Sequence, residues 1–374
     1  MSEAASAARA VPIAFADRVV AWHATHGRHD LPWQTTRDPY RIWLSEVMLQ
    51  QTQVTAVIPY YHRFLEALPD VGALARAPLD VVLGLWSGLG YYRRARHLHE
   101  AAQVVMREHQ GRFPRDADAI AALPGVGRST AAAIAAFAFG TRGAILDGNV
   151  KRVFARHRGV EGFPGEPRVA RVLWAAAESV LPACDIEAYT QAMMDLGATV
   201  CVRHRPRCER CPVAEDCIAR LEQRVTALPT PRPNRTLPER SVRMLVLDAG
   251  GAVLLERRGT TGVWGGLWSL PELTMESDVR SVCASRYAVV ADAAACEPLA
   301  PIDHAFTHFR LTIHPVHVRL ARAPEAMDGS DRAWVEPGAT RSLGIPAPVR
   351  RLLERLYDPR MGQLPLGADV SFPR

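Results

Sequence analysis

The chain has 374 residues with 48% hydrophobic content, enough for two or three domains, and no run of 18 apolar residues that could cross a membrane. Its net charge of +6 suits a polyanionic partner, although such an excess is common in proteins that bind no nucleic acid. Four of the seven cysteines fall within 17 residues, which argues for a metal centre and against a disulfide framework. We therefore expect a soluble cytoplasmic protein without membrane association.

The basic residues are nearly all arginines. Of the 45 basic residues, 44 are arginine and one is Lys151. A Schiff-base mechanism needs an amine, which only Lys151 or the N-terminus could supply.

The first 225 residues show no alternating strand pattern and are predicted to be all-α. Apolar residues at helical spacing indicate helices, and stretches with Pro and Gly indicate turns. The expected segments are a loose tail at 1–11, a helix at 13–26, turns at 30–40, and helices at 42–56 and 59–67.

Glu46 lies on a largely apolar face of the predicted 42–56 helix. Its neighbours one turn away are Ile42, Trp43, Leu49 and Gln50. A carboxylic acid there would be partly desolvated, which raises its pKa and favours the protonated form. The alternative is a boundary glutamate in a salt bridge.

Aromatic residues, glycines and arginines alternate in the segment Trp86–Arg96. One interpretation is a DNA contact, in which Tyr91 stacks on bases and the arginines meet phosphates. The other is a glycine turn between helices, with Trp86 and Tyr92 in the core. We expect both, with Tyr91 as the functional residue.

A glycine turn followed by an alanine-rich helix occupies the middle of the chain. Gly125 and Gly127 allow positive φ or the close approach of another backbone. Ser129 and Thr130 follow at positions typical of a helix cap, and Gly140 ends the predicted helix. Free N–H groups at such a helix start bind phosphates.

Asp147 precedes a basic helix that contains Lys151, Arg152 and Arg156. The helix N-terminus favours the charged form of this carboxylate. Asp147 and the partly desolvated Glu46 are thus two carboxyl groups in different surroundings. Glycoside cleavage requires such an acid and base pair.

Four cysteines are spaced as C-x6-C-x2-C-x5-C, namely Cys201, Cys208, Cys211 and Cys217. Four thiolates within reach of one another suit zinc or an iron–sulfur cluster, and the spacing alone does not decide between them.

The sequence pattern changes after a proline-rich linker at 227–238. Residues 242–247 and 252–256 are predicted strands joined by a hairpin at Asp248–Gly251, and 309–320 is a further predicted strand. A smaller α+β domain therefore follows the helical one.

Two of these segments resemble one family. LSEVMLQQTQV, which contains Glu46, resembles the active-site helix of MutY-type adenine DNA glycosylases. The glycine turn and Asp147 resemble the helix-hairpin-helix and catalytic aspartate of the wider endonuclease III superfamily, and the resemblance extends over most of the chain, from about residue 13 to residue 320.

The resemblance implies a multidomain fold, with an all-α helix-hairpin-helix glycosylase domain that includes an iron–sulfur loop, followed by a smaller α+β Nudix-like domain. The implied boundaries are a tail at 1–11, the glycosylase domain at 12–226 with the helix-hairpin-helix at about 119–140 and the iron–sulfur loop at 201–217, a linker at 227–240, the Nudix-like domain at 241–360 and a tail at 361–374.

The resemblance also implies a mechanism. Adenine is flipped out of the duplex, because its glycosidic bond cannot be reached within the stack. Glu46 donates a proton to N7 of the purine, Asp147 stabilises the oxocarbenium-like sugar or briefly bonds to it, and water completes the hydrolysis. Asn149 orients the site. The implied DNA-binding residues are Leu49, Gln50, Gln51, Tyr91, Gly125, Gly127, Arg128, Phe306, Thr307 and His308.

Ser129 stands where the bifunctional relatives have a lysine that attacks the sugar and leads to strand cleavage. The serine implies an enzyme with little or no lyase activity, and it is a candidate catalytic residue. It could equally be only a helix cap.

The implied cofactor is a 4Fe-4S cluster held by the four cysteines, with a structural role. The implied partner is double-stranded DNA containing adenine opposite 8-oxoguanine or guanine, bound by a monomer associated with the nucleoid.

Residues 250–272 resemble the Nudix-like lesion-recognition domain of the same family, and 304–309 resemble its loop for 8-oxoguanine. The family usually has Ser where this chain has Thr307, which keeps a hydroxyl but adds a methyl group. True Nudix hydrolases need a Glu-rich metal-binding helix, whereas only Glu272 and Glu276 follow Pro271 closely, so we expect no pyrophosphatase activity.

Three other functions remain open at this point. They are a thymine-glycol or G·T mismatch glycosylase, a DNA-binding iron–sulfur protein that detects lesions without cutting, and a Nudix nucleotide hydrolase. Ser129 disfavours the first of these functions, the two carboxylates of Glu46 and Asp147 disfavour the second, and the missing metal-binding helix disfavours the third.

Overall fold

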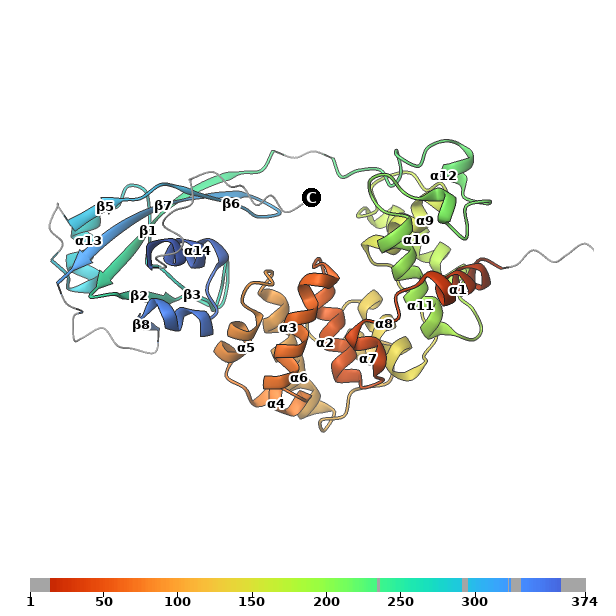
Figure 1. The fold of residues 1–374 in the computed structure, drawn as a ribbon, viewed down its shortest axis with the longest axis horizontal. Coiled ribbons are helices and arrows are strands. Elements are labelled where there is room, and N and C mark those ends of the chain that lie inside the picture. The colour runs from red at the N-terminus through yellow and green to blue at the C-terminus, as the bar shows by residue number, and fades with distance from the viewer. Residues whose placement is uncertain (1–13, 234–235, 291–294, 322, 324–330, 358–374) are drawn as a thin grey trace, which may run out of the picture. The chain divides into compact units, whose positions relative to one another are not determined.

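The protein is described by a computed structural model covering residues 14–233, 236–290, 295–321, 323 and 331–357. The chain divides into two compact units, a helical one and one built on a sheet (Figure 1). Residues 76–99 group with the sheet unit, and the helical unit comprises the remaining described residues before Asn234. The tails expected at 1–11 and 361–374 lie outside the described residues.

The all-α prediction for the first part of the chain is confirmed. The elements in order are α1 (Phe15–His26), η1 (Pro32–Thr35), α2 (Pro39–Leu49), α3 (Val54–Ala67), α4 (Val71–Arg76), α5 (Leu79–Trp86), α6 (Arg93–Glu108), α7 (Ala117–Ala121), α8 (Arg128–Phe139), α9 (Gly148–His157), α10 (Pro167–Ser179), α11 (Ile186–Asp195), the π-helical η2 (Leu196–Val200), η3 (Cys208–Arg210) and α12 (Ile218–Leu221).

The predicted continuous helix at 42–56 is wrong. The helix α2 ends at Leu49, and α3 begins at Val54 and contains Pro59 in its interior. The break occurs because Gln51 adopts a left-handed backbone conformation with φ of 58°, which no helix can include. The loop that follows α2 therefore contains two of the predicted DNA-binding residues.

One hydrophobic core of the helical unit is built from α1, α8, α9, α10 and α11. Alanines dominate α8, so neighbouring helices approach its axis closely, and larger side chains such as Phe154 and Met193 fill the space around it. This packing holds the middle of α8 against the segment Ala144–Leu146, which leads into α9.

The described part of the second unit contains an eight-stranded sheet. Its elements are β1 (Glu239–Ala249), β2 (Ala252–Arg257), β3 (Trp268–Ser269), β4 (Glu272–Leu273), α13 (Val279–Tyr287), β5 (Cys296–Pro298), β6 (Ile302–Ala305), β7 (Arg310–Leu320), β8 (Arg332–Val335), η5 (Pro337–Ser342) and α14 (Ala347–Tyr357).

The three predicted strands are confirmed as parts of β1, β2 and β7. The strands β1 and β2 form the expected antiparallel hairpin, whose turn residues Gly250 and Gly251 both have positive φ. The strand β7 pairs with β1 in parallel along its full length.

Both faces of the sheet are covered. Met244 and Val246 of β1 pack with α14, whereas Leu245 and Leu247 pack with α13 on the opposite face. Because successive side chains of a strand point to opposite faces, a strand covered on both sides has a continuous apolar run.

The segment 76–99 belongs to the second unit through specific contacts. Tyr92 donates its hydroxyl proton to the carbonyl of Ile345 (3.0 Å), and Arg257 forms an ion pair with Asp80 on α5. In the part of the chain that the structure describes, we find no helix with the length and apolarity needed to span a bilayer.

Candidate active site

Glu46 is held on α2, a helix whose start and burial follow from its sequence. Asp38 caps α2 by accepting the N–H of Tyr40 (2.9 Å), and Ile42 and Trp43 are buried on either side of the Glu46 face. The surrounding protein desolvates the carboxyl group and raises the pKa of Glu46 to about 8, with a further contribution from the charge of Asp147. Glu46 is thus protonated at neutral pH.

Asp147 is the N-cap of α9, where its carboxylate accepts the N–H of Val150 (2.8 Å). Burial raises the pKa of Asp147 above its ordinary value, while the Val150 N–H and the positive charge of Arg152 oppose that rise. The helix N-terminus thus favours the charged form of Asp147 as predicted, but burial has the larger effect, and the pKa of Asp147 is raised overall.

The two carboxyl groups lie within electrostatic range of each other, since Asp147 raises the pKa of Glu46. The pair therefore combines a proton donor, Glu46, with a second carboxyl group whose negative charge acts on it.

Ser129 does not cap a helix. The cap position of α8 is Gly127, which makes no side-chain cap bond, and Ser129 instead accepts the backbone N–H of Leu146 (2.8 Å). This bond joins the first turn of α8 to the residue before Asp147. The cap interpretation is thus wrong, and the hydroxyl lies beside the candidate catalytic segment.

The hairpin before α8 has the expected form. Gly125 has φ of 76°, where a larger residue would be strained, and Gly127 leaves the first N–H groups of α8 without a capping side chain. Arg128 lies over the ring of Trp174 (4.0 Å to its centroid) and pairs with Glu178. This exposed ion pair is weak enough for a phosphate to compete with it.

The other predicted DNA-binding residues lie at the end of α2 or in loops. Leu49 is the last residue of α2, and Gln50 and Gln51 follow in the loop, where the side-chain amide of Gln50 lies 3.5 Å from the hydroxyl of Thr130. Tyr91 lies between α5 and α6 with a left-handed backbone, and 48% of the residue is exposed.

Phe306, Thr307 and His308 form the turn between β6 and β7, closed by a bond from the Phe306 N–H to the Phe309 carbonyl (2.9 Å). Phe306 stacks on Phe309 and contacts Trp264, whereas Thr307 and His308 are exposed. A packed phenylalanine thus supports two exposed polar side chains.

Asn149 and Arg152 connect α9 to the loop that contains Cys201. The guanidinium of Arg152 donates to the side-chain oxygen of Asn149 (2.8 Å) and to the carbonyls of Gly197 (2.7 Å) and Cys201 (2.7 Å). The backbone at Gly197 lies close to Asn149: a Cβ atom added at Gly197 would lie only 2.7 Å from the Cβ of Asn149, so only glycine fits at this position.

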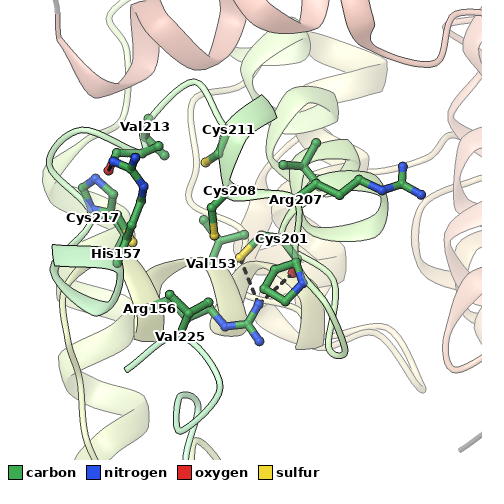
Figure 2. A pocket seen from close by; sticks show the side chains of 14 residues that line it. Val153, Arg156, His157, Cys201, Arg207, Cys208, Cys211, Val213, Cys217 and Val225 are labelled. Carbon is green, nitrogen blue, oxygen red and sulfur yellow. Dashed lines mark hydrogen bonds between the residues drawn. The ribbon is translucent and has the colours of Figure 1, made fainter. Parts of the chain in front are cut away.

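All four predicted metal ligands line one pocket beside α9 (Figure 2). Arg156, nearly fully buried, points into it and donates to the Sγ of Cys201 (3.4 Å) and to the carbonyl of Val202 (2.7 Å). Among the residues that the structure describes, no three Cys, His, Asp or Glu side chains converge closely enough to hold a metal ion. Four thiols around one pocket with an arginine beside a sulfur are nevertheless the donor set that an iron–sulfur cluster needs.

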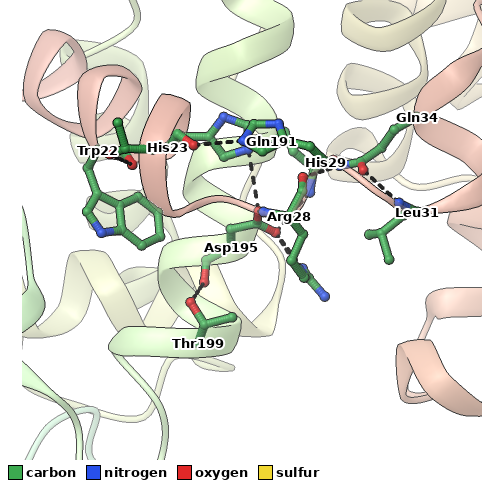
Figure 3. Close-up of polar contacts among 10 residues, drawn as sticks. Trp22, His23, Arg28, His29, Leu31, Gln34, Gln191, Asp195 and Thr199 are labelled. Carbon is green, nitrogen blue, oxygen red and sulfur yellow. Dashed lines mark hydrogen bonds and ion pairs between the residues drawn. The ribbon is translucent and has the colours of Figure 1, made fainter.

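Sequence reasoning missed a buried polar cluster around Asp195 at the end of α11 (Figure 3). The carboxylate of Asp195 is 1% exposed and accepts hydrogen bonds from the backbone N–H (2.7 Å) and the guanidinium of Arg28. It also accepts a hydrogen bond from the side-chain amide of Gln191 (2.9 Å) and lies 3.4 Å from the ring of His23. No sequence signal marks it, because the partners lie up to 172 residues away along the chain.

Two protein-family models match the chain. The HhH-GPD superfamily of base excision DNA repair proteins matches residues 44–179, and the NUDIX domain matches residues 242–355.

Similar proteins cover nearly the whole chain. An adenine DNA glycosylase of Buchnera aphidicola is 33% identical over 341 residues, which are 91% of this chain and 97% of that protein. The mouse adenine DNA glycosylase is 32% identical over 410 residues, with 93% and 79% covered. The solved structure of a thermostable thymine-DNA glycosylase has 31% identity and a TM-score of 0.51, and the match covers 56% of this chain and 95% of that structure.

Proposed function

Because this chain belongs to the adenine DNA glycosylases, hydrolases that act in base excision repair, we propose that it removes adenine paired with 8-oxoguanine or guanine in duplex DNA. The observation that carries the proposal is the pairing of Glu46, whose raised pKa keeps it protonated at neutral pH, with Asp147, whose charge contributes to that raised pKa. Residues 12–226 form the glycosylase domain in this proposal, and residues 241–360 recognise the lesion.

The chemistry begins with a proton. The flipped adenine lies with N7 toward Glu46, which donates its proton and makes the base a better leaving group. Departure of the neutral base leaves positive charge on the sugar, and the carboxylate of Asp147 stabilises that oxocarbenium-like ion or bonds to it briefly. Glu46, now a carboxylate, takes a proton from the water that attacks the sugar.

Asn149 and Ser129 support this pair. Arg152 holds the side-chain oxygen of Asn149, which leaves the amide N–H groups of Asn149 for the sugar or its phosphate. Ser129 fixes the backbone before Asp147. Neither contributes an amine, so the proposed enzyme hydrolyses the glycosidic bond without cutting the strand.

DNA recognition uses residues from both units. The uncapped N–H groups of α8, with Gly125, Gly127 and Arg128, bind backbone phosphate. The remaining proposed contacts are Leu49, Gln50, Gln51 and Tyr91 around the gap left by the flipped base, and Phe306, Thr307 and His308 at 8-oxoguanine.

The second unit is proposed to bind the lesion and not to hydrolyse nucleotides. Glu272 pairs with Arg258, and the nine residues of α13 that follow include no acidic residue. A Nudix hydrolase needs several glutamates on such a helix to hold its metal ion.

A panel of duplexes tests this proposal. We expect release of adenine from duplexes with A opposite 8-oxoguanine or guanine, strand breaks only after alkali, and no stoichiometric covalent complex on borohydride reduction, since the chain has no lysine in place of Ser129. Release of thymine glycol, or of thymine from a G·T pair, would instead support the alternative suggested by the similarity of the helical unit to a thymine-DNA glycosylase. Binding without any base release would support a lesion detector.

The four cysteines are proposed to hold a 4Fe-4S cluster, as is typical of endonuclease III-like proteins. The cluster would fold residues 201–217, with its exposed arginines, into a phosphate-binding loop. We expect purified protein to be brown with visible thiolate-to-iron absorbance, and Cys217→Ser to lose that absorbance and the protection of the loop from protease. A colourless protein that contains zinc would contradict the assignment.

A further inference from the structure

Tyr91 combines an exposed aromatic ring with an unfavourable backbone. Its φ of 48° lies in the left-handed region, and 48% of the residue is exposed. Gly88 and Gly90 beside it also have positive φ, at 106° and 74°, but glycine adopts such angles readily, whereas tyrosine does not. A strained conformation of this kind persists only where the surrounding structure enforces it.

The side chain of Arg94 makes several contacts with this loop. It is 9% exposed, and its guanidinium donates to the carbonyls of Leu89 (3.4 Å) and Gly90 (3.3 Å). The guanidinium carbon lies 5.3 Å from the ring centroid of Trp86 and 5.6 Å from that of Tyr91, within cation–π range of both. Its backbone N–H also donates to the carbonyl of Tyr91 (2.9 Å).

The two aromatic rings near Arg94 differ in exposure, since Trp86 is buried and Tyr91 is exposed. Trp86 is fully buried, and its indole N–H donates to the carbonyl of Gly90 (3.2 Å), so it anchors the loop to the core. Arg94 connects this anchor to the ring of Tyr91. Burial lowers the pKa of Arg94 to about 10, so the group stays charged at neutral pH.

We propose that Arg94 is a positioning residue that holds the ring of Tyr91 ready to insert into the DNA duplex. The inference rests on the proposed role of Tyr91 in filling the gap beside the flipped adenine. The guanidinium of Arg94 donates to two carbonyls and lies within cation–π range of two rings, a combination that the compact ammonium of lysine cannot reproduce. Arg94 itself does not need to touch DNA for this role.

A double-mutant cycle tests the inference. Arg94→Met and Arg94→Lys are made in the wild type and in Tyr91→Ala, and single-turnover excision of adenine opposite 8-oxoguanine is measured for each. We expect Arg94→Met to lower the rate about tenfold, Arg94→Lys to lower it less, and neither to lower it further once Tyr91 is alanine. Arg107→Met, exposed on the same helix and paired with Glu108, is the matched control and should leave the rate unchanged.

A second readout separates positioning from folding. Fluorescence of 2-aminopurine placed next to the adenine reports unstacking by the inserted ring, in a duplex whose 2′-fluorinated adenosine resists excision because fluorine destabilises the oxocarbenium ion. Arg94→Met should reduce this signal as Tyr91→Ala does, while thermal unfolding of Arg94→Lys stays close to that of the wild type.

The outcomes are distinguishable. An equal loss from Arg94→Met in both backgrounds would show that Arg94 acts independently of Tyr91 and would overturn the inference alone. Normal excision and fluorescence in Tyr91→Ala would remove Tyr91 from the proposed function, and the positioning role with it.

Discussion

Replacing Glu46 with glutamine is expected to abolish adenine excision while duplex binding persists. Glutamine keeps the size and polarity of the side chain but has no acidic proton to give to N7. General acid–base catalysis contributes about 10²–10⁴-fold to a rate, so a loss of at least this size is expected in single-turnover excision. Binding of the duplex with adenine opposite 8-oxoguanine, measured by fluorescence anisotropy, should remain within a few-fold of the wild type.

The matched control is Glu187→Gln, at a partly exposed glutamate of α11 that pairs with Arg37. It makes the same chemical change outside the site and should retain full activity. Appreciable excision by Glu46→Gln, or loss of both binding and excision, would count against Glu46 as the proton donor.

Replacing Asp147 with asparagine is expected to lower excision by about 10²–10³-fold, the usual effect of removing one electrostatic stabiliser of a transition state. Asparagine caps helices as well as aspartate does, so α9 and the bond to the Val150 N–H should survive. The loss would therefore come from the missing negative charge beside the sugar and not from unfolding.

A second effect of Asp147→Asn follows from the coupling of the pair. The charge of Asp147 contributes to the raised pKa of Glu46, so its removal should lower that pKa and move the alkaline decline of residual activity to lower pH. Asp278→Asn, which changes the N-cap of α13 in the same way, is the control and should leave both rate and pH profile unchanged. An alkaline decline at the same pH in Asp147→Asn would mean that the two carboxyl groups do not interact.

Much of the fold follows from local sequence. Two apolar runs around the hairpin Asp248–Gly251 identified β1 and β2, an alternating pattern identified β7, and alanine-rich composition with Gly140 identified α8. Glu46 could be singled out because its own helix supplies the apolar neighbours that desolvate it. These features depend on residues within one or two turns of each other.

The rest depends on contacts between distant segments. No proline or glycine marks the end of α2 at Leu49 in the sequence. The helix ends there because Gln51 has a left-handed backbone, a conformation that glutamine does not prefer and that the surrounding fold imposes. Ser129 looks like a helix cap in sequence, yet its partner is Leu146, across the turn that joins α8 to α9. The roles of Arg94 and Arg156 likewise require knowledge of which carbonyls surround a buried guanidinium.

The measurement that bears most directly on the paired carboxyl groups is the pH dependence of single-turnover adenine excision. A protonated Glu46 is required, so the rate should fall as pH rises through about 8, the pKa raised by burial and by Asp147. It should also fall in acid as Asp147 takes up a proton, and both limits belong to the coupled pair. A rate that stays constant as pH rises well above 8 would contradict a proton donor at position 46. A rate that already falls with rising pH near the ordinary pKa of a glutamate would contradict it as well.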